Sequence, residues 1–156
     1  MPRIEPIAEP SDEERKAILA PLDAFSRKAG HVWKPEGIAL VLRDDDGTIV
    51  GGVLGETDWG WLRIAILAVD ERLRGQDWGT RLMDEAERIA VARGCHHAWV
   101  DTFSFQARPF YERLGYRVFG ELPDYPKGET RYFLAKPLVG PVEAGRVPSP
   151  PEGVGP

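Results

Sequence analysis

The sequence has 156 residues, a net charge of -5 and a composition that is 42% hydrophobic and 29% charged. These values are typical of one globular domain, which at this length buries a core without metal or disulfide cross-links. The acidic balance argues against a general nucleic-acid binder, because phosphate binding needs a basic surface. Cys95 is the single cysteine, which excludes internal disulfides and multi-cysteine zinc sites and suits a reducing compartment.

The two ends of the sequence bear on location and domain organisation. Residues 1–11 lack the basic and apolar regions of a signal peptide, and no apolar run approaches the ~20 residues needed to cross a bilayer. We therefore expect a cytoplasmic protein without membrane or nucleic-acid partners. Residues 139–156 contain four Gly and five Pro, which is typical of a flexible tail. The expected organisation is a single domain over residues 1–138 followed by this tail.

Taken in chain order, the first half of the sequence predicts a strand, a helix and a meander. Residues 3–8 are expected to form the first strand. Ser11 and Glu14 fit a capping box, so a helix begins there and runs to about Ala29, with Pro21 predicting a kink or a break. Three antiparallel strands joined by Asp- and Gly-containing turns follow, over residues 37–43, 48–55 and 61–69.

The second half of the sequence alternates helices with strands. Apolar residues at helical spacing from Leu82 to Ala90 predict a helix that ends near Gly94. A strand over residues 97–102 then completes a right-handed parallel crossover. A short helix and two strands follow, over residues 106–114, 116–122 and 131–135. The predicted fold is therefore mixed α/β, of the α+β kind, with a mostly antiparallel sheet of six to seven strands and helices on both faces.

The most informative stretch leads from an apolar strand through a short loop, residues 74–79, into a helix. Its glycines let the backbone approach an anion closely, and the unpaired N–H groups and dipole of the helix start favour a diphosphate. Arg72, Arg74 and Arg81 can add positive charge at the rim. By itself the loop is either a phosphate site or a plain strand-to-helix turn. It matches neither a P-loop nor a Rossmann fingerprint.

A second stretch, residues 103–116, follows the next strand and reads Phe-Ser-Phe-Gln-Ala-Arg-Pro-Phe-Tyr-Glu-Arg-Leu-Gly-Tyr. Together the two stretches resemble the Gcn5-related N-acetyltransferase (GNAT) superfamily over residues 38–138. The loop is similar to the family's Arg/Gln-x-x-Gly-x-Gly/Ala pattern, and the second stretch to its Ala-x-x-Phe-Tyr-Glu-x-Leu-Gly-Phe/Tyr segment. The resemblance implies a sheet splayed between strands 4 and 5, acetyl-CoA as cosubstrate and no metal. The cofactor-binding residues that it implies are Ala68, Val69, Arg74, Gly75, Gln76, Asp77, Trp78, Gly79, Thr80 and Ser104.

Two positions depart from the family's pattern. The middle glycine of the loop is Asp77, whose carboxylate would repel a diphosphate. We therefore expect it to point away from the anion and to act as a helix N-cap. The asparagine that family members often carry before the second helix is Ser104. Its hydroxyl can still hydrogen-bond a pantetheine chain, with less reach.

The catalytic assignments combine the resemblance with residue chemistry. Tyr111 stands at the family's position for the acid that protonates the departing thiolate; the alternative is a core tyrosine with a satisfied hydroxyl. Backbone groups of Ala68 and Val69 are expected to contact the thioester and pantetheine. Asp101 ranks first as general base because it ends a strand beside the splay. Glu56 is a second candidate, as is Asp58 beside it, and a water chain is a further alternative.

The leading prediction is an acetyl-CoA-dependent N-acetyltransferase that acts on a primary amine of a small, unidentified acceptor. A non-catalytic acyl-CoA-binding or regulatory module stays open, because the strand at residues 61–69 carries no carboxylate. A ligand-free interaction domain is a third alternative. His96 and His97 are expected to point to opposite faces of a strand and to be structural. Homodimers are common in the family, but no feature of the sequence decides the oligomeric state.

Overall fold

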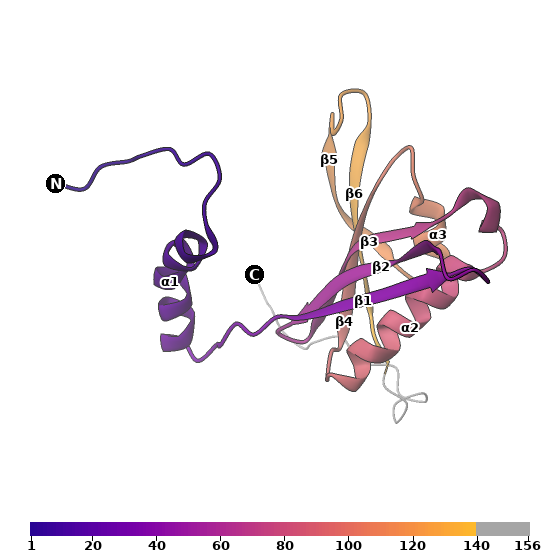
Figure 1. The fold of residues 1–156 in the computed structure, drawn as a ribbon, viewed down its shortest axis with the longest axis horizontal. Helices are drawn as coiled ribbons and strands as arrows, with labels where there is room; N and C mark the ends of the chain where they lie inside the picture. Colours follow the sequence, from indigo (N-terminus) through magenta and orange to yellow (C-terminus); the bar gives the residue numbers. More distant parts are fainter. Residues whose placement is uncertain (140–156) are drawn as a thin grey trace, which may run out of the picture. The chain divides into compact units, whose positions relative to one another are not determined.

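The computed structural model describes residues 1–139, and the chain divides into two compact units, Met1–Lys34 and Pro35–Pro156 (Figure 1). The single domain expected over residues 1–138 stays a prediction. Apart from Val139, the predicted tail lies outside the described residues. In the part of the chain that the structure describes, no helix is long and apolar enough to span a bilayer.

The first unit contains helix α1 (Asp12–Lys28), which begins with the predicted capping box. The Ser11 hydroxyl accepts a hydrogen bond from the Glu14 N–H at 3.2 Å, and the Glu14 carboxylate accepts one from the Ser11 N–H at 2.8 Å. Of the kink or break predicted at Pro21, the break is wrong, because α1 continues through this residue, and the kink stays a prediction. A proline removes one helical hydrogen bond, and a 17-residue helix capped in this way retains the others.

The strand predicted over residues 3–8 is also wrong, since this segment has no regular secondary structure. A strand is stable only when neighbouring strands pair with it. Among the described residues, every strand of the sheet lies in the second unit. The sheet therefore has six strands, at the lower end of the predicted range.

The second unit is built on a six-stranded mixed sheet, which confirms the predicted fold class. Its strands are β1 (Glu36–Arg43), β2 (Ile49–Asp58), β3 (Trp61–Val69), β4 (His97–Phe103), β5 (Arg117–Pro123) and β6 (Thr130–Pro137). Their order across the sheet is β1-β2-β3-β4-β6-β5, and among the described pairs β3 and β4 alone run parallel. Helix α2 (Trp78–Ala92) forms the predicted crossover between these two strands, and α3 (Arg108–Arg113) follows β4.

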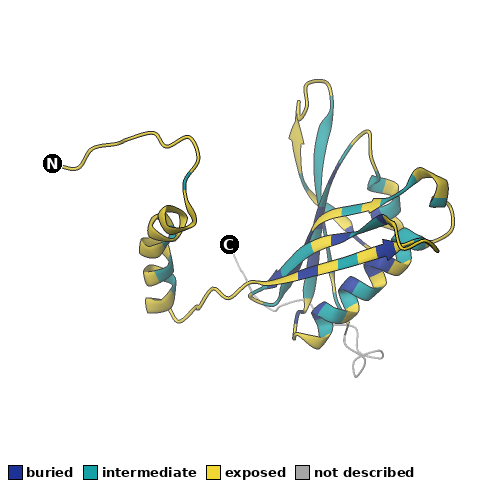
Figure 2. Ribbon diagram, viewed as in Figure 1, coloured by how far each residue is buried: buried dark blue, intermediate teal, exposed yellow. Residues whose placement is uncertain are grey.

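Both helices of the second unit contribute to one core with the strands. Helix α2 supplies Leu82, Met83, Ala86 and Ala90, all buried, and α3 supplies Tyr111. Buried residues alternate with less buried ones along β4, as expected for a strand with one face on the core. Figure 2 shows a similar alternation along β1. The second face of β4 carries Trp99, Asp101 and Phe103.

Strands β3 and β4 separate after a short paired stretch. Their register extends only from Trp61 opposite His97 to Ile64 opposite Val100. Beyond that point β3 stays paired with β2, and β4 stays paired with β6. Among the described residues, the main chain of residues 65–69 therefore has no partner strand on the side of β4. This confirms the expected splay, which falls between β3 and β4 because the first predicted strand is absent.

Candidate active site

The connection from β3 to α2 is a tight loop with an unusual backbone. A single 3-10 turn, η1 (Glu71–Leu73), follows β3, and the carboxylate of Asp70 caps it by accepting from the Arg72 N–H at 3.0 Å. Gly75 and Asp77 then adopt left-handed conformations, with φ values of 77° and 61°. A left-handed residue turns the chain sharply and changes the direction of the neighbouring N–H groups.

The backbone N–H groups of residues 75–80 donate no hydrogen bond to any other described residue. The first N–H of this region with a partner is that of Arg81, which donates to the Asp77 carbonyl at 3.0 Å. A Cβ atom on Gly75 would meet nothing within 4 Å, so space is open in front of the loop. Unsatisfied amides at the positive end of a helix dipole attract an anion. The loop thus combines unsatisfied N–H groups with open space at Gly75, two features that the binding of a phosphate requires.

Asp77 occupies the predicted N-cap position, but the predicted capping role of its side chain is wrong. An N-cap residue normally has an extended backbone, from which its side chain reaches the amides of the first turn. Asp77 is left-handed instead, and its carboxylate makes no capping hydrogen bond. The carboxylate is exposed and does not occupy the amides of the loop.

The three arginines around the loop differ in their surroundings. Arg72 pairs with the Asp70 carboxylate at 2.9 Å. The guanidinium of Arg81 lies over the ring of Trp78, 4.3 Å from its centroid. Arg74 is exposed and forms no ion pair within the described residues. Arg74 is thus the arginine most available to an anion at the loop.

Other residues assigned to the loop have packing roles as well. A Cβ atom on Gly79 would lie 3.2 Å from the ring of Phe110, so this glycine lets α2 approach α3 closely. The Gln76 side-chain amide donates to the Arg72 carbonyl at 3.5 Å. Trp78 packs against the edge of the core. The sequence pattern could not separate these packing roles from contact with an anion.

Tyr111 has a buried ring and a hydroxyl that lacks an internal partner. Its residue is 7% exposed, and the ring contacts those of Phe110 and Tyr116 edge-on. Among the described residues, no hydrogen bond involves the Tyr111 hydroxyl, and no fully buried side-chain polar atom is unsatisfied. The hydroxyl therefore reaches the protein surface. Burial, and secondarily the charge of Asp101, raises the pKa of Tyr111 to about 12. Tyr111 is consequently a proton donor at neutral pH.

Asp101 presents one oxygen to the protein and one to the surroundings. The Nε and Nη2 atoms of Arg131 in β6 both bind its Oδ2, at 2.8 and 2.7 Å. No described residue donates a hydrogen bond to Oδ1. A carboxylate fixed by one oxygen can accept a proton with the other in a defined orientation. Because its charge affects the pKa of Tyr111, the two side chains lie within electrostatic reach of each other.

Glu56, the second candidate base, lies beside the part of the sheet in which β3 and β4 are still paired. It is opposite Arg63 of β3, and its carboxylate is 3.7 Å from that guanidinium. Arg63 belongs to the stretch of β3 that is still paired with β4, and it lies over the Trp99 ring at 5.3 Å. Asp58 ends β2 opposite Trp61, further from the opening. The geometry thus favours Asp101 over either alternative.

The hydroxyl of Ser104 is already engaged within the protein. It donates to the carboxylate of Glu129 and accepts from the Thr130 N–H at 3.0 Å. These hydrogen bonds connect the turn after β4 to the start of β6. A contact between Ser104 and pantetheine stays a prediction, and it would compete with these bonds. Sequence reasoning did not find Thr130 or Arg131, and it did not find the contact of Glu129 with Ser104, because contacts between distant segments leave no local pattern.

The prediction that His96 and His97 point to opposite faces is wrong. Their Nδ1 atoms lie 2.6 Å apart, and the His97 ring stacks on that of Trp61 at 4.6 Å. The strand begins only at His97, so the alternation of a strand does not apply to His96. Burial, followed by the charge of His96, lowers the pKa of His97. Within residues 1–139, no group of three metal-ligating side chains includes this pair.

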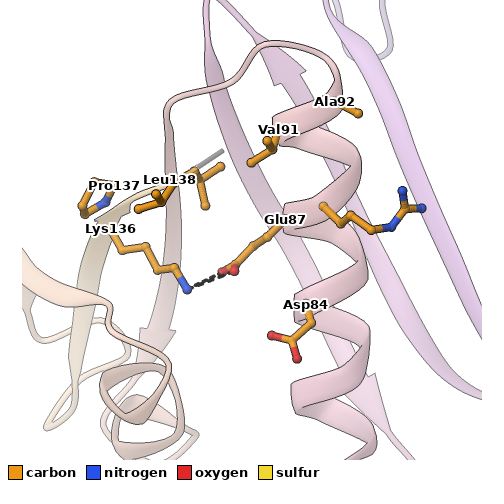
Figure 3. A pocket seen from close by; sticks show the side chains of 9 residues that line it. Asp84, Glu87, Val91, Ala92, Lys136, Pro137 and Leu138 are labelled. Atoms are coloured by element: carbon orange, nitrogen blue, oxygen red, sulfur yellow. Dashed lines mark hydrogen bonds and ion pairs between the residues drawn. The ribbon is translucent and has the colours of Figure 1, made fainter. Parts of the chain in front are cut away.

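A hollow of about 680 Å³ lies away from the loop, between α2 and the end of β6 (Figure 3). There the Lys136 ammonium donates to the Glu87 carboxylate at 2.9 Å, and Glu87 also accepts from the Tyr116 hydroxyl at 2.8 Å. Burial and the Glu87 charge raise the pKa of Tyr116. These polar groups satisfy one another, so the network joins α2 to β6 and offers no open catalytic group.

Comparison with known proteins supports the resemblance. The chain matches the Acetyltransferase (GNAT) family over residues 5–116. It is 43% identical over 93 residues to blasticidin-S acetyltransferase of Streptomyces morookaense, which is 59% of this chain and 68% of that protein. It is 35% identical over 124 residues to an acetyltransferase of Agrobacterium fabrum, or 80% of this chain and 90% of that protein. The crystal structure of a Bacillus cereus acetyltransferase has a TM-score of 0.75 at 34% identity and covers 86% of this chain and 98% of its own.

The family match includes both the loop at residues 74–79 and the segment around Tyr111. Relatives named as acetyltransferases favour an enzyme over a non-catalytic acyl-CoA-binding module. The splayed six-stranded sheet agrees with this assignment. The chain therefore belongs to the GNAT family and is an N-acetyltransferase.

Proposed function

We propose that the protein transfers the acetyl group of acetyl-CoA to a primary amine of a small acceptor molecule. The observation that carries this proposal is the row of backbone amides at residues 75–80 that donate no hydrogen bond to a described residue. A diphosphate would satisfy these amides, and Arg74 would add charge. The unpaired edge of β3 at Ala68 and Val69 could then bond the amides of pantetheine, which would bring the thioester into the splay.

The reaction requires an amine nitrogen with a free lone pair and a protonated leaving group. Oδ1 of Asp101 would accept a proton from the ammonium, directly or through water, while Arg131 holds Oδ2. The nitrogen then forms a C–N bond to the acetyl carbon as the C–S bond breaks. The Tyr111 hydroxyl would give its proton to the departing sulfur and regain one from solvent. The nitrogen, cationic after the attack, loses its second proton to solvent, and Asp101 releases the first proton to solvent as well. Since solvent returns one proton to Tyr111, the net products are an amide, the free thiol of CoA and one proton.

The acceptor and the location belong to the same proposal. One relative, blasticidin-S acetyltransferase, is named after a small molecule. This name supports a small molecule over a protein as the acceptor of this chain. Cys95 is a buried free thiol, which suits a reducing compartment. We therefore place the activity in the cytoplasm.

The function is tested by following thiol release from acetyl-CoA in the presence of a panel of primary amines. We expect release that depends on the amine, and mass spectrometry should find one acetyl group on the amine product. Thiol release at the same rate without an amine, or no release with any amine while CoA still binds, would contradict the proposal.

Replacing Tyr111 separates chemistry from folding. We expect Tyr111→Phe to lower kcat about 100-fold, because the variant lacks the proton donor. Its stability should change little, since the hydroxyl makes no hydrogen bond with a described residue. The matched variant Tyr116→Phe loses a buried bond to Glu87 and should lose about 1–3 kcal/mol of stability with kcat retained. Wild-type kcat in Tyr111→Phe would remove this residue from the mechanism.

The pH dependence of kcat tests the state of Tyr111. Its pKa is raised to about 12, so the protonated form is complete below the ordinary value near 10 and is lost only as the pH rises through 12. We therefore expect no fall in kcat from this group between pH 7 and about pH 10. A fall in kcat over this pH range that occurs in the wild type and not in Tyr111→Phe would contradict the raised pKa of Tyr111.

Asp77 should weaken acetyl-CoA binding through its charge. Asn keeps the preference for a left-handed backbone and removes the carboxylate, so Asp77→Asn should lower the Kd for CoA about two- to fivefold at low salt. The gain should shrink in high salt, which screens exposed charges. The matched variant Glu71→Gln removes a charge from the neighbouring turn and should have a smaller effect. Calorimetric titration that finds weaker CoA binding by Asp77→Asn would contradict this account.

A further inference from the structure

A second hollow, of about 380 Å³, lies between the end of β4 and the loop that joins β5 to β6. Phe103 is the last residue of β4, and Phe105 follows in the next turn. The other lining residues are in the β5–β6 loop: Asp124, Tyr125 and Pro126. None of these residues has a role in the proposed transfer step.

The walls of this hollow are aromatic rings with nearly parallel planes. The rings of Phe103 and Phe105 have centroids 5.4 Å apart and planes inclined by 17°. Those of Phe103 and Tyr125 are 5.7 Å apart and inclined by 27°. Phe105 is 58% exposed and Tyr125 46% exposed, although both are large apolar rings. Aromatic surface gathered in a hollow and left open to water is typical of a binding site.

Internal hydrogen bonds already hold the hollow in shape. Arg131 donates to the Tyr125 hydroxyl at 3.0 Å, and its guanidinium lies 4.9 Å from the Tyr125 ring centroid. The Tyr125 N–H donates to the Glu129 carbonyl at 3.1 Å. The Asp124 carboxylate accepts from the Gly128 N–H at 3.1 Å. Because the loop is already ordered, a ligand that binds there loses little affinity to the conformational entropy of ordering it.

Arg131 connects this hollow to the candidate catalytic carboxylate. The same guanidinium that binds Tyr125 pairs with Asp101 at 2.7 Å. The hollow and Asp101 therefore share a contact with one side chain, that of Arg131. Asp124 is the charged residue among those that line the hollow, and the Arg131 guanidinium lies 4.9 Å from the Tyr125 ring and 5.4 Å from the Phe103 ring. Both signs of charge are thus present, and the aromatic rings are the feature that would select a ligand.

We propose that this hollow binds a flat aromatic ring of the acceptor, so that the substrates are primary amines joined by a short linker to an aromatic or heteroaromatic ring. This inference rests on the proposed function and names the substrate class of the same site. The ring would stack against Phe105 and Tyr125 while the amine points toward Asp101. Stacking needs a planar face, which a saturated ring or an open alkyl chain does not offer.

The inference is tested with four primary amines that differ mainly in flatness. The value of kcat/KM is measured with acetyl-CoA for 2-phenylethylamine, tryptamine, 2-cyclohexylethylamine and n-hexylamine. We expect both aromatic amines to exceed both saturated ones about tenfold, which corresponds to stacking on the exposed rings. Equal values for the four amines, or higher values for the saturated pair, would overturn the inference.

Variants of the hollow attribute the preference to its rings. Phe105→Leu and Tyr125→Leu should each raise KM for the aromatic amines several-fold. In Phe105→Leu, kcat/KM for n-hexylamine and the Kd for CoA should be unchanged. Tyr125→Leu also removes a hydrogen bond from Arg131, so it is compared with Tyr125→Phe, which removes the same bond. Tyr125→Phe keeps the ring and should keep the preference. Phe119 is 65% exposed but does not line the hollow, so Phe119→Leu should behave as the wild type. An unchanged preference in both leucine variants at Phe105 and Tyr125 would overturn the inference.

Direct binding distinguishes failure of this inference from failure of the proposed function. Saturation-transfer NMR measures binding of 2-phenylethylamine and n-hexylamine to the CoA-bound protein, whether or not transfer occurs. If the wild type binds the aromatic amine preferentially and Phe105→Leu does not, the hollow is the binding site for the ring. If the wild type shows this binding but no turnover, only the proposed acetyl transfer is contradicted. If n-hexylamine is turned over as fast as 2-phenylethylamine, the proposal that the hollow binds an aromatic ring is wrong, and the proposed acetyl transfer is unaffected.

Discussion

The early separation of β3 from β4 is the constraint on which the candidate site depends. Two parallel strands paired to their ends would use the main-chain groups of residues 65–69 in the sheet and leave no edge for a ligand. Here the pairing stops at Ile64 and Val100, and beyond that point β3 pairs with β2 and β4 pairs with β6. The chain then leaves β3 through η1 into α2. The open edge of β3 and the unsatisfied amides of the helix start are therefore consecutive in the chain.

The opening also joins two groups that differ in environment. The Tyr111 ring is buried, which disfavours its charged form and keeps the phenol protonated. Arg131 binds one oxygen of Asp101 and leaves the second open. In the proposed mechanism Tyr111 would donate a proton and Asp101 would accept one. Because Arg131 also binds Tyr125, one side chain orients both the acceptor carboxylate and the aromatic hollow.

Local patterns in the sequence predicted most of the fold. The capping box at Ser11, the meander and the crossover helix each depend on residues close together in the chain, and all are present. The strand predicted at residues 3–8 failed because a strand needs a neighbour, which a local pattern does not reveal. The break predicted at Pro21 failed because a capped helix tolerates the loss of one hydrogen bond.

The candidate site was less accessible to sequence reasoning, for a physical reason. The loop and Tyr111 lie in continuous motifs and could be found. By contrast, the partners that define their surroundings come from distant segments: Arg131 for Asp101, Glu129 for Ser104, and Phe110 for Gly79. The left-handed backbone of Asp77 was also hidden, because aspartate is common at helix starts in its extended form.

The central claim is that acetyl-CoA binds with its diphosphate on the amides before α2 and its pantetheine along the open edge of β3. NMR titration of the protein with CoA tests this most directly. The account predicts that the backbone amide resonances with the largest shifts belong to residues 75–80 and to Ala68 and Val69. Those near Glu87 and Lys136, in the hollow between α2 and β6, should stay in place. Shifts concentrated around Glu87 and Lys136, with residues 75–80 unaffected, would contradict the account.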